Sequence, residues 1–353
     1  MKSSEKESSK SRLKSLKEAL AKFFKTDEFN LQELDSGASV RRYYFLNFSG
    51  ETYFPHSRIV LMQVPPGNPE MLDDYLTIQN YLVRYKIPTP QIFEVNRSKG
   101  WIFLARAEGI QLSHYLRDNP EKMPEIYNQL TDYLIALQQK ARPESYCPAF
   151  QRFFDREKYM FEFRFHVREK LLTNYFRYPL SLKEEYSFRE MENRISEYLD
   201  IKLPIFVHRD FQSSNIFYDD QNPETPFQII DFQDARCGNP VYDLVSLGWD
   251  SYVSIPTRIR ETMVQKFWKN NPLINKNYSP EEYQQIIDFT IIQRKLHDAG
   301  AFVHSYHVTG NDQFLPYIRP AIAMAIEVLQ NYKPFQPVGS LFLKLMDKKI
   351  QNS

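Results

Sequence analysis

Residues 207–217 read Val-His-Arg-Asp-Phe-Gln-Ser-Ser-Asn-Ile-Phe, and residues 229–236 read Ile-Ile-Asp-Phe-Gln-Asp-Ala-Arg. The first segment places Asp210 and Asn215 on one short loop, and the second ends an apolar strand at Asp231. A hairpin between the segments would return Asp231 to the side of that loop. This spacing is typical of phosphoryl transfer from ATP, in which one Asp accepts the proton of the acceptor hydroxyl while an Asn and a second Asp hold Mg²⁺. We therefore predict that Asp210 is the catalytic base and that Asn215 and Asp231 bind magnesium.

The surrounding residues give this short pattern its weight. His-x-Asp-x-x-x-x-Asn alone would occur by chance in roughly one chain in twenty of this length. An apolar run precedes the loop, and Asp243 opens an apolar helix after the hairpin. We expect His208 and Arg209 to support the loop and Asp243 to accept hydrogen bonds from its backbone. In the alternative interpretation, Asp210 and Asp231 are ordinary turn carboxylates, and His208 is a core residue hydrogen-bonded to the backbone.

Length and composition indicate a globular protein of about two domains. The chain has 353 residues, 42% of them hydrophobic, and 45 Lys and Arg against 44 Asp and Glu. A net charge of +1 offers no long-range attraction for nucleic acid or an anionic membrane, so we expect neither partner. Cys147 and Cys237 form no metal-type pair, which favours the reducing cytoplasm. No apolar run reaches the roughly 18 residues of a membrane span, and residues 1–11 lack the apolar core of a signal peptide.

Hydrophobic periodicity divides the chain into a β-rich part and a helical part. Apolar side chains at helical spacing predict helices over residues 12–25 and 69–86. Runs rich in Tyr, Phe, Val and Ile predict strands at 29–34, 41–48, 58–64, 92–95 and 101–104. We predict an α+β, two-lobed fold like that of protein kinases: a disordered tail (1–11), a small antiparallel β lobe that binds nucleotide (12–105) and a larger, mainly helical lobe for catalysis and substrate (106–353).

The predicted β lobe contains the candidate phosphate-binding groups. Gly37 and Ser39 lie in the turn between its first two strands, where a kinase covers the ATP phosphates with backbone N–H groups. A kinase also needs a cation in the sheet, yet Met62 stands in the third strand where a Lys is expected. We predict that Arg41 or Arg42 replaces this Lys; because side chains alternate along a strand, only one of them would face the nucleotide. Otherwise the two form a solvated charge pair, or activity has been lost.

Together these residues resemble the aminoglycoside phosphotransferase family. The loop with His208, Asp210 and Asn215 and the metal motif at Asp231 carry the resemblance. Further stretches are similar to the branch of anomeric N-acetylmuramate and N-acetylglucosamine kinases of cell-wall recycling: Gly37–Tyr43, Ile230–Ala235 and Gln293–Phe302. The resemblance implies a kinase-like fold without the sheet Lys, ATP and Mg²⁺ as cofactors, and transfer of the γ-phosphate to the C1 hydroxyl of an amino sugar.

The same resemblance places a helix at residues 154–163 beside the sugar pocket. Asp155 and Glu162 are seven residues apart, hence on one helical face, and could accept hydrogen bonds from sugar hydroxyls. Asp234, in the metal motif, is a third candidate for substrate binding. Alternatively, Asp155 and Glu162 are surface carboxylates paired with nearby arginines.

Other acceptors and other functions are compatible with the sequence. The basic C-terminus argues against a polycationic aminoglycoside, whereas choline needs an aromatic cage that 23 Tyr and 27 Phe could supply anywhere. The missing Lys also allows a nucleotide-binding module without turnover. His297, His304 and His307 could bind a metal from one face of a continuous helix, although Gly300 argues against such a helix. Our expectation is a monomeric, cytoplasmic enzyme that acts on a small sugar.

Overall fold

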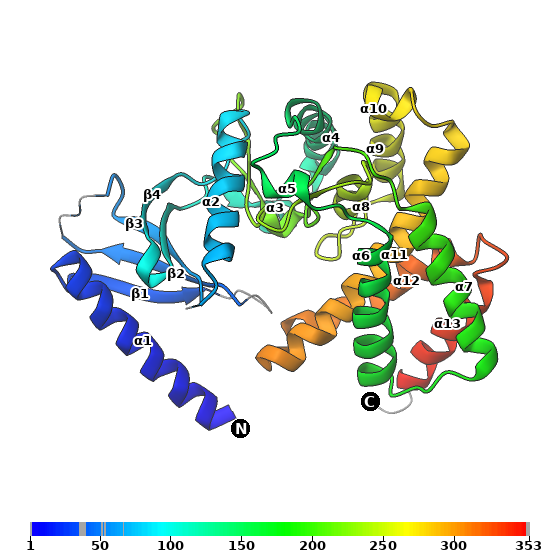
Figure 1. Ribbon diagram of the computed structural model, residues 1–353, viewed down its shortest axis with the longest axis horizontal. Helices are drawn as coiled ribbons and strands as arrows, with labels where there is room; N and C mark the ends of the chain where they lie inside the picture. Colours follow the sequence, from blue (N-terminus) through cyan, green and yellow to red (C-terminus); the bar gives the residue numbers. More distant parts are fainter. Residues whose placement is uncertain (1, 35–39, 51, 53, 66, 351–353) are drawn as a thin grey trace. The chain divides into compact units, whose positions relative to one another are not determined.

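The computed structural model describes residues 2–34, 40–50, 52, 54–65 and 67–350 (Figure 1). The chain forms two compact units. The first unit contains residues 1–76 and 89–108, and the second contains residues 77–88 and 109–353. An antiparallel five-stranded sheet dominates the first unit and helices dominate the second, which confirms the predicted α+β fold. The chain finally leaves the first unit after Glu108.

The sheet of the first unit has the strand order β1-β2-β3-β5-β4, and neighbouring strands are antiparallel. Its strands are β1 (Phe29–Leu34), β2 (Arg42–Phe48), β3 (Arg58–Gln63), β4 (Ile92–Asn96) and β5 (Trp101–Ala105). Each corresponds to a predicted strand. Tyr44, Leu61 and Phe103 lie opposite one another in the register, and all three are buried. The alternation of side chains along the strands thus builds one row of the core.

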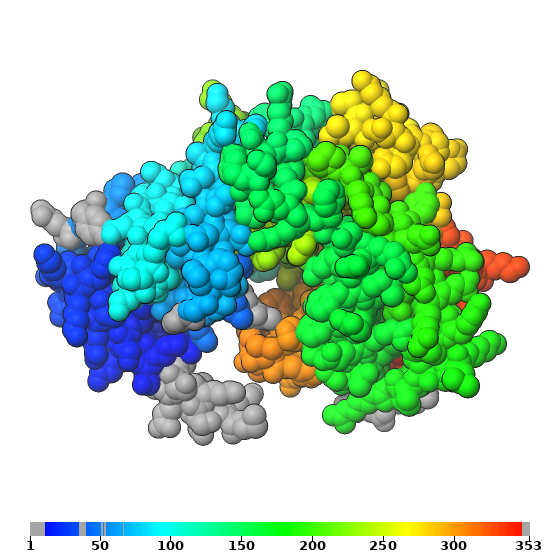
Figure 2. All heavy atoms as spheres, in the orientation of Figure 1, coloured from blue at the N-terminus to red at the C-terminus, as the bar shows by residue number. Residues whose placement is uncertain are grey.

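Helix α1 (Lys2–Phe24) packs apolar side chains on this sheet. Leu16 and Leu20 are buried, and the ring of Phe24 lies 5.2 Å from that of Phe48. On the face shown in Figure 2, the blue and cyan atoms of the first unit lie side by side. The helix begins at Lys2, so residues that we expected to form a disordered tail belong to its first turns. Lys and Glu are good helix formers without an apolar face, which is why periodicity did not reveal this extension.

The second unit is built mainly of helices. They are α3 (Leu112–Asp118), α4 (Met123–Lys140), α5 (Pro148–Gln151), α6 (Arg156–Glu162), α7 (Leu182–Tyr198), α8 (Tyr242–Gly248), α9 (Thr257–Asn270), α10 (Pro272–Asn275), α11 (Pro280–Thr309), α12 (Ile318–Leu329) and α13 (Gln336–Ile350). Helix α2 (Pro69–Arg84) starts in the first unit and ends in the second. A π-helix, η3 (Phe163–Tyr175), continues directly from α6. In the part of the chain that the structure describes, no helix is long and apolar enough to cross a membrane.

Two small β structures position the segments on which the predicted chemistry depends. Strands β6 (Ile110–Gln111), β8 (Ile216–Tyr218) and β9 (Phe227–Ile229) form one antiparallel sheet, and β7 (Phe206–Val207) pairs with β10 (Arg236–Cys237). Strands β8 and β9 are the predicted hairpin. Just before β6, Gly109 has a φ of 78°, and a Cβ there would come 2.2 Å from the carbonyl oxygen of Tyr218. Only glycine fits this approach of the two strands.

Helix α11, with 30 residues, supports the site from within the second unit. Ser279 and Glu282 form a capping box at its N-terminus. The helix lies so close to η3 that a Cβ at Gly300 would come 2.0 Å from the carbonyl oxygen of His166. It is continuous through Gly300, which we had taken as an argument against it. The glycine therefore allows close packing and does not end the helix.

Candidate active site

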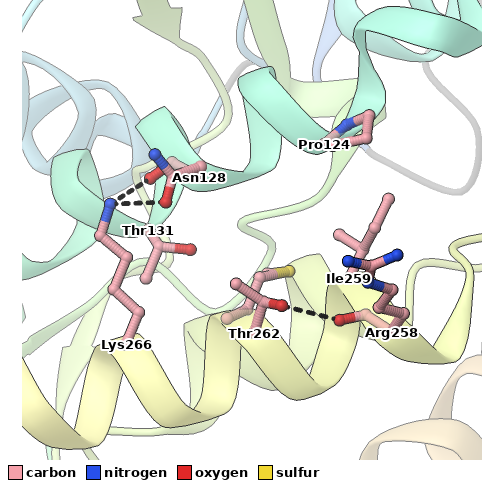
Figure 3. A pocket seen from close by; sticks show the side chains of 8 residues that line it. Pro124, Asn128, Thr131, Arg258, Ile259, Thr262 and Lys266 are labelled. Carbon is pink, nitrogen blue, oxygen red and sulfur yellow. Dashed lines mark hydrogen bonds between the residues drawn. The ribbon is translucent and has the colours of Figure 1, made fainter.

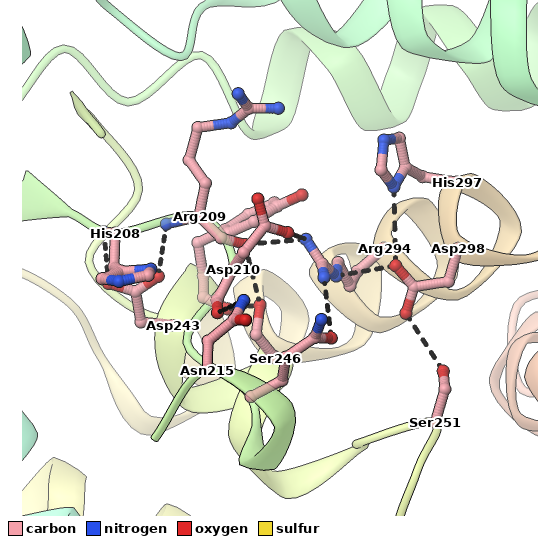
Figure 4. Close-up of polar contacts among 12 residues, drawn as sticks. His208, Arg209, Asp210, Asn215, Asp243, Ser246, Ser251, Arg294, His297 and Asp298 are labelled. Atoms are coloured by element: carbon pink, nitrogen blue, oxygen red, sulfur yellow. Dashed lines mark hydrogen bonds and ion pairs between the residues drawn. The ribbon is translucent and has the colours of Figure 1, made fainter. Parts of the chain in front are cut away.

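The loop at residues 208–215 follows β7 and is held through its backbone by buried carboxylates. Asp243 of α8 accepts the N–H of His208 at 2.7 Å and that of Arg209 at 2.9 Å (Figure 4). Arg209 has a φ of 77°, an unusual conformation for a residue with a side chain, and the contact with Asp243 helps to hold it. Burial raises the pKa of Asp243 to about 7. A second buried carboxylate, Asp250, accepts a backbone N–H from farther along the loop at 2.7 Å.

His208 links the loop to the hairpin from inside the core. The residue is fully buried, and its Nε2 lies 3.0 Å from the carbonyl oxygen of Ile230. Burial lowers the pKa of His208 to about 4, so the ring is neutral near neutral pH. A neutral ring that donates to a backbone carbonyl fixes the position of the loop. The role of His208 as support for the loop stays a prediction, and this contact is compatible with it.

Asp210 lies against a buried arginine that our sequence analysis did not assign to the site. Arg294 of α11 places Nη1 at 3.0 Å from Oδ1 of Asp210 and at 2.7 Å from the carbonyl oxygen of Arg209 (Figure 4). Its Nη2 reaches the side-chain oxygen of Gln212 at 3.2 Å. The side chain of Arg294 is 3% exposed, whereas that of Asp210 is 31% exposed. Asp210 is therefore held from the inside and accessible from the outside.

Electrostatics keeps Asp210 ionised. Burial by itself would raise its pKa, but the guanidinium groups of Arg294 and Arg209 outweigh burial and hold the pKa below its usual value. Arg294 is fixed in turn by Asp298, whose Oδ1 lies 2.9 Å from Nε, and Lys295 contacts the other oxygen of Asp298 at 2.6 Å. Two carboxylates and two cations thus form a charge-balanced network. At neutral pH its outer member, Asp210, can accept a hydrogen bond from a hydroxyl.

The structure brings Asn215 and Asp231 to the same loop and hairpin as Asp210. Asn215 donates from Nδ2 to the carbonyl oxygen of Asp210 at 2.9 Å, which leaves Oδ1 as the amide atom that can bind a cation. The N–H of Ile230 bonds to the carbonyl oxygen of Asn215 at 3.0 Å, so Asp231 directly follows a residue in contact with Asn215. Asp231 has a φ of 62°, and Gln233 donates to its Oδ1 at 2.6 Å. An amide oxygen and a carboxylate are hard ligands that fit Mg²⁺.

The histidines of α11 do not form the alternative metal site. Within the described residues, no three or more His, Cys, Asp or Glu side chains are grouped so that they could hold a metal ion. The ring of His297 lies 4.2 Å from that of His166, and His304 packs edge-on against Phe165. The hypothesis of a metal site at His297, His304 and His307 is therefore wrong. The helix is continuous, as that site required, but His297 and His304 pack against η3 instead.

Two candidates for sugar binding, Asp155 and Glu162, bind protein groups at the two ends of α6. Asp155 caps the helix and accepts the N–H of Lys158 at 3.0 Å. Glu162 is buried: Arg209 and an amide of α11 donate to its two oxygens at 2.9 and 2.8 Å, and the Lys158 ammonium lies 3.4 Å away. Burial opposes ionisation of Glu162, but His297 and Arg209 outweigh it and lower the pKa to about 2. Glu162 is thus not the surface residue of our alternative interpretation, and its role toward a sugar stays a prediction.

Asp234, the third candidate for sugar binding, lies in the metal motif just before β10. Its Oδ2 is 3.4 Å from the side-chain nitrogen of Gln233, the residue that also bonds Asp231. The structure therefore places Asp234 next to a predicted magnesium ligand. Its contact with a substrate stays a prediction.

The candidate phosphate-binding residues belong to the first unit. Gly37 and Ser39 lie outside the described residues. Arg41 is 7% exposed, and Arg42, at the start of β2, pairs with a carboxylate of β1 at 2.9 Å. Met62 is fully buried in β3, so the position where we expected a Lys belongs to the core of the sheet. The choice between Arg41 and Arg42 stays a prediction.

Two cavities of the second unit are lined by other residues. One of about 410 Å³ lies between α4 and α9, where Lys266 bonds to Asn128 at 2.8 Å (Figure 3). Lys266 also bonds to Asp132 at 2.6 Å. Another, of about 540 Å³, is bordered by aromatic rings that include Phe289 and Tyr332. None of the predicted site residues lines either cavity. The loop and hairpin are the candidate site because they carry Asp210, Asn215 and Asp231, whose side chains fit phosphoryl transfer.

Comparison with known proteins defines the class of protein. Residues 30–271 match the phosphotransferase enzyme family, and this span includes Asp210, Asn215 and Asp231. The chain belongs to the phosphotransferase enzyme family, which confirms the resemblance seen in its motifs.

Individual relatives narrow the comparison. An N-acetylmuramate/N-acetylglucosamine kinase of Neisseria meningitidis serogroup B is 24% identical over 341 residues, which cover 95% of this chain and 97% of the relative. A protein of the same name from Pseudomonas aeruginosa is also 24% identical and covers 84% of each chain.

Solved structures show the same fold at lower identity. The aminoglycoside phosphotransferase in the gentamicin-APH(2″)-IIa complex has a TM-score of 0.58 at 13% identity, covering 88% of this chain and 97% of its own. A choline kinase from Cryptosporidium parvum Iowa II has a TM-score of 0.57 at 10% identity, and the match covers 89% of this chain and 93% of the choline kinase. At such identities the likeness shows the fold alone.

Proposed function

We propose that this protein transfers the γ-phosphate of ATP to the C1 hydroxyl of an amino sugar, N-acetylmuramate or N-acetylglucosamine. One observation carries the proposal: Asp210 is ionised and partly exposed, and Arg294 holds its carboxylate in place. Such a carboxylate can orient a hydroxyl and take its proton. Asn215 lies on the same loop as Asp210. The names of relatives that match almost the whole chain support the amino sugar. The metal motif and residues 293–302 resemble those of the anomeric amino-sugar kinases, and this resemblance supports attack by the C1 oxygen.

Each residue of the site has a role in this mechanism. Mg²⁺, when held by Asn215 and Asp231, supplies positive charge to the phosphates of ATP. Asp210 orients the sugar hydroxyl and accepts its proton as the sugar oxygen bonds to the γ-phosphorus and the bond from that phosphorus to the β,γ-bridging oxygen breaks, so that ADP leaves. Arg294 keeps Asp210 ionised and in place, while Asp243 fixes the backbone of the loop. In the first unit, either Arg41 or Arg42 takes the role of the missing Lys.

The setting of the reaction is part of the same proposal. We expect a monomer that works in the cytoplasm, where ATP is available and thiols stay reduced. Cys147 and Cys237 are free and buried, which is compatible with this setting.

A screen of free sugars tests the proposal. Purified protein is incubated with ATP, MgCl₂ and one acceptor at a time; ADP formation is measured, and phosphorus NMR locates the new phosphate. We expect ADP formation with N-acetylmuramate or N-acetylglucosamine and a product phosphorylated at C1. Asp210→Asn should lose about a hundredfold to ten-thousandfold in turnover, and Asp231→Ala should raise the magnesium concentration that activity requires.

Two results would contradict parts of this proposal. Nucleotide binding without ADP formation on any amino sugar, aminoglycoside or choline would reject the enzyme and favour a nucleotide-binding module. A phosphate on another hydroxyl would reject C1 while leaving the amino-sugar kinase in place.

A further inference from the structure

Two cations approach one buried carboxylate beside the 208–215 loop. The Lys158 ammonium lies 3.4 Å from Oε1 of Glu162, and Nη2 of Arg209 lies 2.9 Å from the same oxygen. Gln293 donates to the other oxygen of Glu162 at 2.8 Å. The side chains of Lys158 and Arg209 are 23% and 12% exposed, whereas Glu162 is 1% exposed. Both oxygens of the carboxylate are thus occupied by protein groups, while the side chain of Lys158 is still partly exposed.

A third cation, Arg236, stands at the start of β10. It pairs in register with Val207 of β7, the residue directly before the loop. Its Nη1 lies 3.4 Å from the carbonyl oxygen of Phe153, and the next residue, Cys237, forms a β-bridge with Phe153. Arg236 is therefore fixed between the loop and the start of α6. Its Nε is buried and makes no hydrogen bond to any described residue.

The carboxylates near these cations do not balance them. Glu162 acts on Lys158, Arg209 and Arg236, and Asp234 acts on the two arginines only. Asp210 also acts on Arg209, but it is already paired with Arg294. Burial lowers the pKa of Lys158, and the positive charges of Arg209 and Arg236 lower it further. Burial lowers the pKa of Arg236 as well, and Arg209 adds to this effect. A half-buried cation with too little negative charge around it is costly, so a bound anion would stabilise this group.

We propose that Lys158 and Arg236 form a subsite that binds a carboxylate of the acceptor. This inference rests on the proposed function and makes it more specific. N-acetylmuramate carries a carboxylate on its lactyl ether and N-acetylglucosamine has none, so the subsite makes the protein prefer the acidic sugar. A guanidinium can hold a carboxylate with two parallel hydrogen bonds, and the ammonium adds a point charge. Both residues determine specificity and take no part in the transfer of the phosphoryl group.

The ratio of kcat/KM for N-acetylmuramate to kcat/KM for N-acetylglucosamine tests the subsite. A charge-assisted hydrogen bond is lost in Arg236→Gln, so this ratio should fall about tenfold to hundredfold. Lys158→Met should lower it by a smaller factor. Arg194→Gln is the matched control, because Arg194 lies on α7, is 56% exposed and pairs with a neighbour on its own helix. The control should leave the ratio unchanged.

A change on the substrate gives an independent check. The methyl ester of N-acetylmuramate adds one methyl group to the sugar and removes its charge, so Arg236→Gln should lose its effect on this substrate. An unchanged ratio in Arg236→Gln, or an equal loss for acid and ester, would overturn the subsite. If the wild type phosphorylates neither sugar, the proposed function is wrong. The subsite is then tested by calorimetry, which measures the binding of N-acetylmuramate. N-acetylmuramate that binds the wild type more tightly than Arg236→Gln would support it, and equal or absent binding would overturn it.

Discussion

Replacing Glu162 by Gln removes a buried charge and keeps the shape of the side chain. In the wild type this carboxylate lies 2.9 Å from Arg209 and is 1% exposed. Burial opposes its ionisation, but His297 and Arg209 outweigh burial and lower the pKa to about 2, against an ordinary value of about 4.3. One pKa unit corresponds to about 1.4 kcal/mol, so the ionised group contributes about 3 kcal/mol to the free energy of unfolding at pH 7. We expect Glu162→Gln to lose about this amount.

The loss should depend on pH in one direction. A carboxyl whose folded-state pKa lies below its unfolded value stabilises fully above the unfolded pKa and loses this contribution as the pH falls toward the folded pKa. For Glu162 this window runs from about pH 5 down to about pH 2. Gln resembles the protonated acid at every pH. The difference in stability between wild type and variant should therefore narrow by about 1 kcal/mol between pH 7 and pH 3.5.

Urea unfolding at the two pH values, followed by circular dichroism, measures this difference. Glu157→Gln is the matched control, because Glu157 is an exposed residue of the same helix. It should change stability by less than about 0.5 kcal/mol. A variant Glu162→Gln as stable as the wild type at pH 7 would refute the reasoning. So would a difference that is the same at both pH values.

Two further substitutions test other contacts of the second unit. Arg294→Lys keeps the positive charge beside Asp210 but loses the planar guanidinium that also holds the loop backbone. Turnover should therefore fall about tenfold or more, while the apparent affinity for ATP changes little. Wild-type turnover in steady-state assays would contradict this role of Arg294. Gly300→Ala should lower stability by about 1–3 kcal/mol, because its Cβ would meet the carbonyl oxygen of His166 at 2.0 Å. In thermal unfolding, Gly248→Ala should be neutral or stabilising, because its Cβ would meet ordinary contacts at 3.6 Å; equal effects of the two alanines would contradict the packing argument.

Features that depend on local spacing could be predicted from the sequence. The strands of the first unit show alternation and β-branched or aromatic residues, and turn residues separate them. The loop and hairpin could be placed because two short apolar segments, strands β8 and β9, flank residues 219–226, which are rich in the turn residues Asp, Asn and Pro.

Features that depend on distant contacts could not be predicted. Arg294 lies 84 positions from Asp210, and nothing in the residues around either one indicates that their side chains meet. Glu162 looked like a surface or sugar-binding carboxylate because helical spacing shows which residues share a face and not what covers that face. Its burial depends on Arg209 and Gln293, which come from other parts of the chain.

Asp243 and Asp250 hold the backbone of the loop, and this affects how far the loop sequence can diverge between related proteins. Both carboxylates bind main-chain N–H groups, which every residue type except proline offers. The path of the loop therefore depends on the two carboxylates, while the side chains of His208 and Arg209 make separate contacts with Ile230 and Glu162. Distant members of the family would then be recognised more safely by the two anchoring carboxylates than by the letters of the loop itself.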